Sequence, residues 1–469
     1  MRHRPSALLL AILLLVAGLL DAPGAAATGP SPVPTSPLVS VPPLLHDGPI
    51  TLPNGRVLPA MPVGLQQSSI QAQMLAEHAG DRVEFTPGTR PRPRSEPTAD
   101  LALGADQPFG SASLELAAQG QAAGTLAATS LPNGMRKEVF GFLPYWMLSS
   151  SDLQWMQYQL VTTVAYFGVA ARSDGTLAVK NSDGTLTAGW AGWTSSGMTS
   201  VTNAAHARGV RVVLTVTMMA WDGGVGQAAL LGSATARSKL VAAIVKAVGD
   251  RAADGVNLDF EPVSTSVRDQ YTSFVRQLKA GLVAGKVGSY LTVDTMAGAA
   301  TWATGYDVTG LTASGAADAL FVMGYDYSWS GSARAGGVAP MESPYMLDVN
   351  ESVDDYLQLA AGGRIIWGVP YYGRTWQTTS SALNALTRSG SSGASKAYYY
   401  TGARDKAAQY GRLWDSYGRG PWFKYWDAAA GTWVEGYYDD AASLAYKYDM
   451  VNLRGLAGTG MWTLLMDEG

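Results

Sequence analysis

Short apolar segments alternate with amphipathic segments from about Met135 to the end of the chain. Several apolar segments contain almost no polar residue, which is typical of strands buried on both faces of a parallel sheet. Runs of three to seven residues of this kind predict strands at 139–143, 160–166, 210–216, 255–260, 290–295, 319–323, 365–369 and 460–462.

The segments between these strands repeat apolar positions with the spacing of a helix. They predict helices at 196–208, 235–253, 265–284, 349–361 and 440–454. Strands that alternate with helices indicate an α/β protein, and eight such strands predict a (β/α)8 TIM barrel. An open doubly wound sheet is the alternative, but no Gly-rich phosphate loop follows the first strand.

One connection is longer than usual. About sixty residues separate the seventh predicted strand from the last helix, well above the ordinary loop length. Aromatic runs at 398–401 and 422–426 indicate strands, and residues 401–410 indicate a helix. We therefore expect a small α+β insertion at about 375–436, between strand seven and the last helix.

The N-terminus has the pattern of an export signal, which we place at residues 1–27. Arg2, His3 and Arg4 precede an apolar run from Ala7 to Leu20, and three alanines end at Ala27. The run is short for a membrane span, so we expect cleavage, an extracellular or cell-surface location and no stable membrane insertion, with an uncleaved anchor as the alternative.

Residues 28–134 differ from the barrel region, 135–469, because short Pro-rich pieces recur in them. Proline disfavours helices and central strands, so this region predicts an irregular linker or stalk. Residues 114–128 are rich in alanine and predict one helix.

Charge and composition exclude several classes of function. A net charge of −4 argues against a nucleic-acid binder with a broad basic surface. The chain has no Cys and four His, none of them in an H-E-x-x-H pattern, so we expect no metal site and no cofactor. Its 14 Trp and 22 Tyr suit a wet groove that binds sugars, although many aromatic residues belong to cores. We expect a monomer.

Polar residues interrupt the fourth predicted strand at alternate positions. Asn257, Asp259 and Glu261 lie two residues apart, so their side chains share one face, toward the barrel interior. Glu261 falls at the carboxyl end of the strand, where barrel active sites are built. The neighbouring carboxyl group of Asp259 should raise the pKa of Glu261, which suits a general acid. A buried polar cluster or a cation site is the alternative.

The segment Asp254-Gly-Val-Asn-Leu-Asp-Phe-Glu261 resembles the signature Asp-x-x-Asp-x-Asp-x-Glu of glycoside hydrolase family 18, the chitinase family. Five other segments resemble the family in order and spacing, and the likeness covers about residues 136–469. The opening segment suggests the bacterial spore-germination branch. These segments are Phe140-Gly-Phe-Leu-Pro-Tyr-Trp146, Met323-Gly-Tyr-Asp326, Gly368-Val-Pro-Tyr-Tyr-Gly-Arg374, and the closing pair Tyr438-Asp-Asp-Ala-Ala-Ser-Leu444 and Gly460-Met-Trp462.

The resemblance implies retaining hydrolysis assisted by the substrate, an exception to the usual scheme of two catalytic carboxylates. It implies that Glu261 protonates the leaving oxygen, that the 2-acetamido oxygen attacks the anomeric carbon, and that Asp259 stabilises the acetamido nitrogen. Tyr325 would hydrogen-bond the acetamido group, Asp326 would hold the sugar, and Trp462 would form the floor of the subsite. For these three residues, rim packing, helix capping and core packing are the respective alternatives.

Further residues near the predicted strand ends are candidates for substrate binding. Met323 belongs to the strand-six motif, and Arg374 is expected to pair with a carboxylate near the site or on the surface. Core packing is the alternative for the aromatic candidates, which are Tyr145, Trp146, Trp221, Trp329 and Tyr371.

Two departures from the family pattern affect these expectations. Asn257 stands where the signature has its second acid, and an amide is expected to donate a hydrogen bond to Asp259 without sharing a proton. No full helix is predicted after the eighth strand. The expected partner is a polysaccharide, either chitin or peptidoglycan, with peptidoglycan favoured. A non-catalytic carbohydrate-binding protein and a structural protein acting through the stalk are the alternatives.

Overall fold

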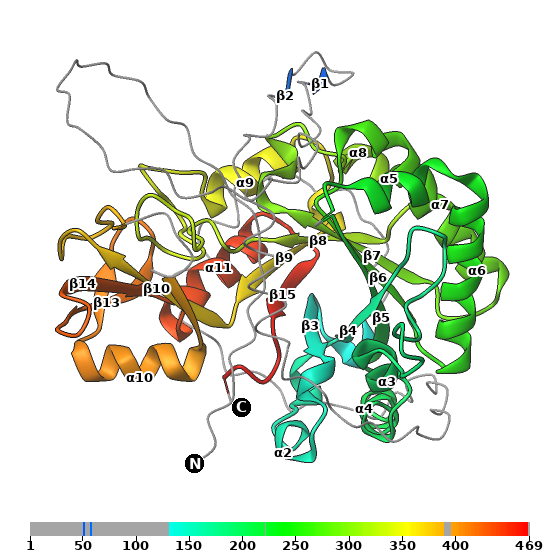
Figure 1. Cartoon of the computed structure of the whole chain (residues 1–469), viewed down its shortest axis with the longest axis horizontal. Coiled ribbons are helices and arrows are strands. Elements are labelled where there is room, and N and C mark those ends of the chain that lie inside the picture. The colour runs from blue at the N-terminus through cyan, green and yellow to red at the C-terminus, as the bar shows by residue number, and fades with distance from the viewer. Residues whose placement is uncertain (1–49, 52–56, 59–130, 221, 389–394, 468–469) are drawn as a thin grey trace, which may run out of the picture.

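Eight parallel strands close into a barrel in the computed structural model, which describes residues 50–51, 57–58, 131–220, 222–388 and 395–467. The strand order is β15-β3-β4-β5-β6-β7-β8-β9 (Figure 1), which confirms the predicted (β/α)8 barrel. The strands are β3 (Glu138–Pro144), β4 (Thr163–Ala170), β5 (Arg211–Met219), β6 (Gly255–Glu261), β7 (Tyr290–Met296), β8 (Ala319–Met323), β9 (Ile365–Pro370) and β15 (Gly458–Trp462).

Seven of the eight predicted strands differ from the observed ones by no more than three residues at either end. The exception is the second strand, predicted at 160–166, which ends four residues before β4 does at Ala170. Its predicted start at Leu160 also lies three residues early, in a short 3-10 helix, Tyr158–Leu160. Leu160 is exposed, and the buried run of β4 begins only at Thr163. An apolar residue at a strand entrance therefore extended the prediction too far.

Helices surround the barrel, and several begin at a side chain that caps the first turn. Ser195, Ser233 and Asp348 accept hydrogen bonds from backbone N–H groups, and Asp440 forms a capping box with Ser443. The helices are α2 (Ser150–Leu153), α3 (Ala188–Trp193), α4 (Ser196–His206), α5 (Val225–Gly232), α6 (Ala234–Asp250), α7 (Arg268–Ala284), α8 (Val308–Leu311), α9 (Val349–Leu357) and α11 (Ala441–Leu453).

Aromatic rings fill part of the barrel interior. The Phe321 ring lies 5.4 Å from that of Phe140 and 4.9 Å from that of Phe142, centroid to centroid. Two glycines make room for it, because a Cβ on Gly368 would lie 2.7 Å from the ring and one on Gly460 would lie 2.4 Å from it. The packed lower barrel supports the polar residues that lie further along the strands.

An antiparallel sheet follows the seventh barrel strand, which confirms the expected insertion and its mixed composition. Five strands pair in the order β11-β10-β14-β13-β12, and α10 (Tyr400–Tyr410) packs on one face through Ala403 and Ala407. Figure 1 shows this unit beside α11, across the barrel from α6 and α7. Its strands are β10 (Tyr372–Thr378), β11 (Ser395–Tyr399), β12 (Leu413–Asp415), β13 (Gly420–Asp427) and β14 (Thr432–Tyr437).

Little of the N-terminal third is described. Two short strands, β1 (Ile50–Thr51) and β2 (Val57–Leu58), pair antiparallel within the region predicted to be irregular. The predicted export signal and the predicted helix at 114–128 lie outside the described residues. Within the described part, no single helix has the length and hydropathy of a membrane span, and α5 with α6 meets that test only as a pair bent by 92°.

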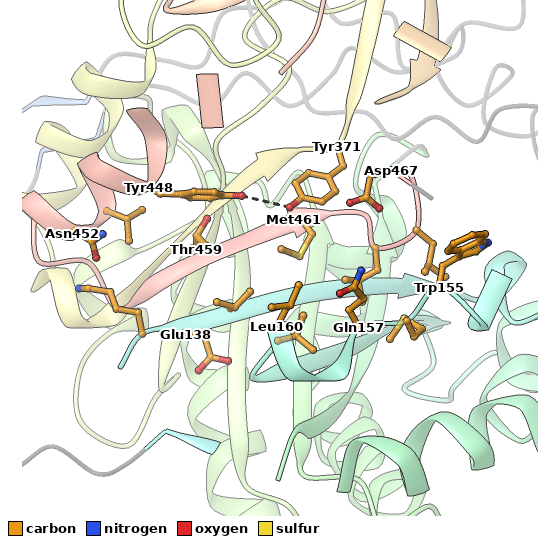
Figure 2. Close-up of a pocket in the computed structure, with 17 residues that line it drawn as sticks. Glu138, Trp155, Gln157, Leu160, Tyr371, Tyr448, Asn452, Thr459, Met461 and Asp467 are labelled. Atoms are coloured by element: carbon orange, nitrogen blue, oxygen red, sulfur yellow. Dashed lines mark hydrogen bonds between the residues drawn. The ribbon is translucent and has the colours of Figure 1, made fainter. Parts of the chain in front are cut away.

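A groove runs along the outside of the barrel, over β3 and β15, and Figure 2 shows its lining. It has a volume of about 380 Å³ and lies between α11 and the short segments before β4. Tyr371 and Tyr448 meet at one side, with 3.5 Å between their hydroxyl oxygens. Residues 463–467, which follow β15, contain no helix. Neither Asp259 nor Glu261 lines this groove.

Candidate active site

The alternation along β6 directs its polar residues into the barrel. Asn257, Asp259 and Glu261 are buried, with 0%, 2% and 3% of their surfaces exposed. Phe260 points outward, where its ring stacks on Tyr271 of α7 at 5.5 Å between centroids. Glu261 is the last residue of the strand, so its carboxyl group lies at the catalytic end of the barrel.

Asp259 and Glu261 form a hydrogen-bonded pair of carboxyl groups, in which Glu261 donates and Asp259 accepts. Burial raises the pKa of Asp259 to about 7, against the opposing effect of this hydrogen bond. Burial also raises the pKa of Glu261 well above its usual range, and the charge of Asp259 raises it further. The upward direction predicted for Glu261 is confirmed, but burial contributes more than the neighbouring charge. A proton therefore stays on Glu261 at neutral pH.

Asn257 does not donate to Asp259, so that expectation from the sequence is wrong. Its Nδ2 donates to Oδ2 of Asp294 on β7 at 2.7 Å, and its Oδ1 accepts from Thr292 Oγ1 at 2.6 Å. Register explains the difference, because Asn257 pairs with Thr292 across the two parallel strands. Asp294, with 2% of its surface exposed, adds a third buried carboxyl group beside the pair.

The first acid of the signature, Asp254, lies at the opposite end of β6 from Glu261. Its Oδ2 accepts from the backbone N–H of Val212 at 2.8 Å and lies 2.9 Å from His206 Nε2. Asp254 thus ties the entrance of β6 to β5 and to the last turn of α4. Its contacts are those of a structural residue.

We expect Asp254→Ala to lower the free energy of unfolding by about 2 kcal/mol, because it removes charged hydrogen bonds to a backbone group and to His206. The change should leave kcat within about twofold of the parent, since Asp254 lies a strand length from Glu261. Urea denaturation and steady-state kinetics on the same preparation measure both quantities. A large loss of kcat in a folded variant would contradict the structural assignment.

Tyr325 and Asp326 follow β8 and are buried beside the carboxyl groups. Burial raises the pKa of Tyr325 well above its usual range, and Asp294, Glu261 and Asp259 raise it further, so its hydroxyl stays protonated. Asp326 has a φ of 56°, a left-handed conformation that few side chains adopt. Its Oδ1 accepts a hydrogen bond from the hydroxyl of Tyr372. The turn thus aims two polar side chains at one end of the barrel.

Trp462 ends β15 and lies almost fully buried among aromatic rings. Its ring lies 4.7 Å from that of Phe167 and 5.3 Å from that of Phe142, centroid to centroid. Met323, at the end of β8, is buried and pairs with Met296 of β7. These apolar residues lie at the barrel end that carries Glu261.

Three further aromatic candidates lie near strand ends and are half-buried: Tyr145, Trp146 and Trp329. Tyr145 and Trp146 contact each other edge to face at 4.8 Å between centroids. The backbone carbonyl of Trp329 accepts from Trp376 Nε1 at 2.9 Å, which joins the barrel rim to the insertion sheet. Trp221 lies outside the described residues.

Two candidates do not lie where the sequence suggested. Tyr371 lines the outer groove and contacts Tyr448, because the side chain directly after β9 points away from the barrel interior. Arg374 is buried on β10 and donates to Ser395 Oγ at 3.0 Å. No salt bridge joins Arg374 to a carboxylate among the described residues, so its expected ion pair is wrong.

Two residues of the site were missed from the sequence. Tyr372 directly follows Tyr371 and faces Asp326, so one position decided which tyrosine belongs to the site. Asp294 lies two positions after Thr292 in a predicted strand, so polar residues alternate there as they do in β6. This alternation could have identified Asp294 from the sequence. In the described part of the chain, no group of three or more His, Asp or Glu side chains is arranged to hold a metal ion.

A sequence model of the glycosyl hydrolases of family 18 matches residues 138–467. The chain belongs to this family. As a family 18 glycoside hydrolase it has chitinase-like relatives, and the match covers the barrel, the insertion and the carboxyl cluster.

Individual relatives match over shorter regions. The Bacillus subtilis protein YdhD, named as a sporulation-specific glycosylase, is 31% identical over 249 residues, or 50% of this chain and 53% of the relative. A Caenorhabditis elegans protein named as an endochitinase is 29% identical over 238 residues, or 46% of this chain and 37% of the relative. The chain thus spans about half or less of the length of these relatives. The crystal structure of YdhD has a TM-score of 0.51 at 26% identity, covering 64% of this chain and 91% of that one.

Proposed function

We propose that this glycoside hydrolase is a secreted, retaining enzyme that cleaves polymers of β-1,4-linked N-acetylglucosamine with assistance from the substrate. The observation that carries the proposal is the hydrogen-bonded pair of Asp259 and Glu261 at the carboxyl end of β6. Glu261 retains a proton that it can transfer to a glycosidic oxygen, and Asp259 ionises at a lower pH. The pair therefore offers one acid and one anion.

The first half of the reaction breaks the glycosidic bond. Glu261 protonates the leaving oxygen while the 2-acetamido oxygen of the sugar attacks the anomeric carbon, which gives an oxazolinium ion. Ionised Asp259 stabilises the positive charge that develops on the acetamido nitrogen. The protonated hydroxyl of Tyr325 donates to the acetamido group, and Trp462 supplies the apolar surface under the sugar.

The second half opens the oxazolinium ion. Glu261, which is now ionised, takes a proton from water as the water attacks the anomeric carbon. Attack from the face opposite the acetamido oxygen restores the starting configuration, so the product retains its anomeric form. Asp326, whose Oδ1 accepts a hydrogen bond from the hydroxyl of Tyr372, lies at this end of the barrel and holds a hydroxyl group of the reacting sugar.

Peptidoglycan, or a related cell-wall glycan, is the favoured substrate, and chitin is the other. The relative YdhD is named as a sporulation-specific glycosylase, and the opening segment from Phe140 to Trp146 resembles the spore-germination branch. The predicted export signal at the N-terminus supports a site of action outside the cytoplasm.

We expect the purified protein to cleave chitohexaose and to leave cellohexaose intact, because cellohexaose has hydroxyl groups where the acetamido nucleophile is needed. Mass spectrometry of the products measures cleavage, and NMR recorded within minutes identifies the anomer first formed. A parallel digest of peptidoglycan tests the favoured substrate. Cleavage of both hexaoses at similar rates, or an inverted product, would contradict participation by the acetamido group.

A further inference from the structure

Asp294 is a buried carboxyl group for which the proposed reaction supplies no role. It lies on β7, next to β6, with 2% of its surface exposed. Asn257 pairs with Thr292, and Leu258 pairs with Val293. The next residues on the two strands, Asp259 and Asp294, therefore lie side by side. Residues with the same alternation share one face, which directs Asp294 toward the interior that holds Asp259 and Glu261.

The hydrogen bonds around Asn257 fix the orientation of Asp294. Thr292 donates to Oδ1 of Asn257, so Nδ2 of the amide must point the other way, and it donates to Oδ2 of Asp294. The second oxygen, Oδ1 of Asp294, has no hydrogen-bond partner among the described residues, and neither has Oδ1 of Asp259. A proton on Asp294 therefore belongs on Oδ1, and buried oxygens of this kind are costly to leave unsatisfied as anions.

The titratable groups that interact electrostatically with Asp294 come from three elements. They are Asp259 and Glu261 on β6, Tyr271 on α7, and Tyr325 after β8. None of these is a cation. Burial raises the pKa of Asp294 well above its usual range and the charge of Asp259 raises it further, while Asp294 in turn raises the pKa of Glu261. The charges of Asp259 and Asp294 thus both favour the protonated form of Glu261.

We propose that Asp294 is a positioning residue that replaces, from the neighbouring strand, the acid missing at position 257, and that it extends the pH range over which Glu261 keeps its proton. Asn257 acts as the bridge that holds Asp294 in place. This inference rests on the proposed function for its catalytic consequence. The part that does not depend on that function is that Asp294 is a third carboxyl group in the cluster and has a raised pKa.

The test compares Asp294→Asn with the double variant Asn257→Asp/Asp294→Asn. The amide introduced by Asp294→Asn keeps the shape of the side chain and can still accept from Asn257, but it cannot ionise. We expect the alkaline limb of kcat/KM for chitohexaose to move to lower pH by about one unit, because Glu261 loses a like-charged neighbour. The double variant returns one acid to the cluster on β6, and we expect it to restore the limb to that of the parent.

A purely structural role would give a different result. In that case Asp294→Asn would lower kcat by the same factor at every pH, the limbs would stay in place, and the double variant would not restore activity. An unmoved alkaline limb in Asp294→Asn overturns the proposal, as does a double variant whose limb stays with that of the single variant.

A measurement without substrate separates this proposal from the proposed function. A raised pKa means that the folded state binds more protons than the unfolded state, so wild-type stability falls as pH rises above the unfolded pKa of about 3.8. Asp294→Asn removes that loss, so the Tm of the variant minus the Tm of wild type should increase as the pH rises from about 4 to 8. If wild type cleaves no glycan but this gain appears, the function fails and the proton-holding Asp294 stands. Parallel curves of Tm against pH overturn it.

Discussion

Glu261→Gln is expected to reduce kcat on chitohexaose by about a thousandfold, the scale of a lost general acid. The amide preserves the size of the side chain and its ability to hydrogen-bond Asp259, but it has no proton to transfer to the leaving oxygen. The loss should appear in kcat while binding of the oligosaccharide remains, because the shape of the subsite is unchanged. Single-turnover kinetics and calorimetric binding to the inactive variant measure the two effects separately.

Glu138→Gln is a matched control, because Glu138 is also a buried glutamate in the barrel. It lies at the entrance of β3, where it pairs with Arg211 and accepts from the hydroxyls of Thr162 and Thr163. We expect this variant to be less stable and to keep its kcat. If Glu261→Gln cleaves as fast as the parent, Glu261 is not the proton donor.

Local patterns were sufficient to predict the barrel. Parallel strands buried on both faces appear as apolar runs, and the runs at β5, β8 and β9 were recognisable for that reason. The face of β6 that carries Asp259 and Glu261 also follows from sequence alone, because side chains alternate along any strand. The insertion was predictable from the length of one connection.

Contacts that depend on register between strands were not predictable. Asn257 finds Asp294 across β6 and β7, and only the pairing of Asn257 with Thr292 reveals this. The choice between Tyr371 and Tyr372 depended on where β9 ends and β10 begins, at a single residue. A shift of one position moves a side chain to the other face, so errors at strand ends become errors in the site.

Asp259→Asn is expected to lower kcat by a factor of about 10² to 10³, the scale found when one group that stabilises transition-state charge is removed. Under the proposed mechanism, positive charge develops on the acetamido nitrogen, and a neutral amide cannot stabilise it as a carboxylate does. Asp254→Asn is the matched control from the same strand, and we expect it to keep its kcat because Asp254 lies at the opposite end. Steady-state kinetics on chitohexaose measure both.

The pH profile of Asp259→Asn provides a second, independent readout. Burial raises the pKa of Asp259 to about 7, so wild-type kcat/KM should fall as pH drops below about 7 and Asp259 gains a proton. The variant has no such group, and its acid limb should disappear. Its alkaline limb should move to lower pH, because the charge of Asp259 contributes to the raised pKa of Glu261. Since the carboxyl groups titrate together, both limbs report on the cluster. A variant with the wild-type rate and both limbs unmoved would mean that the anion beside Glu261 takes no part in the reaction.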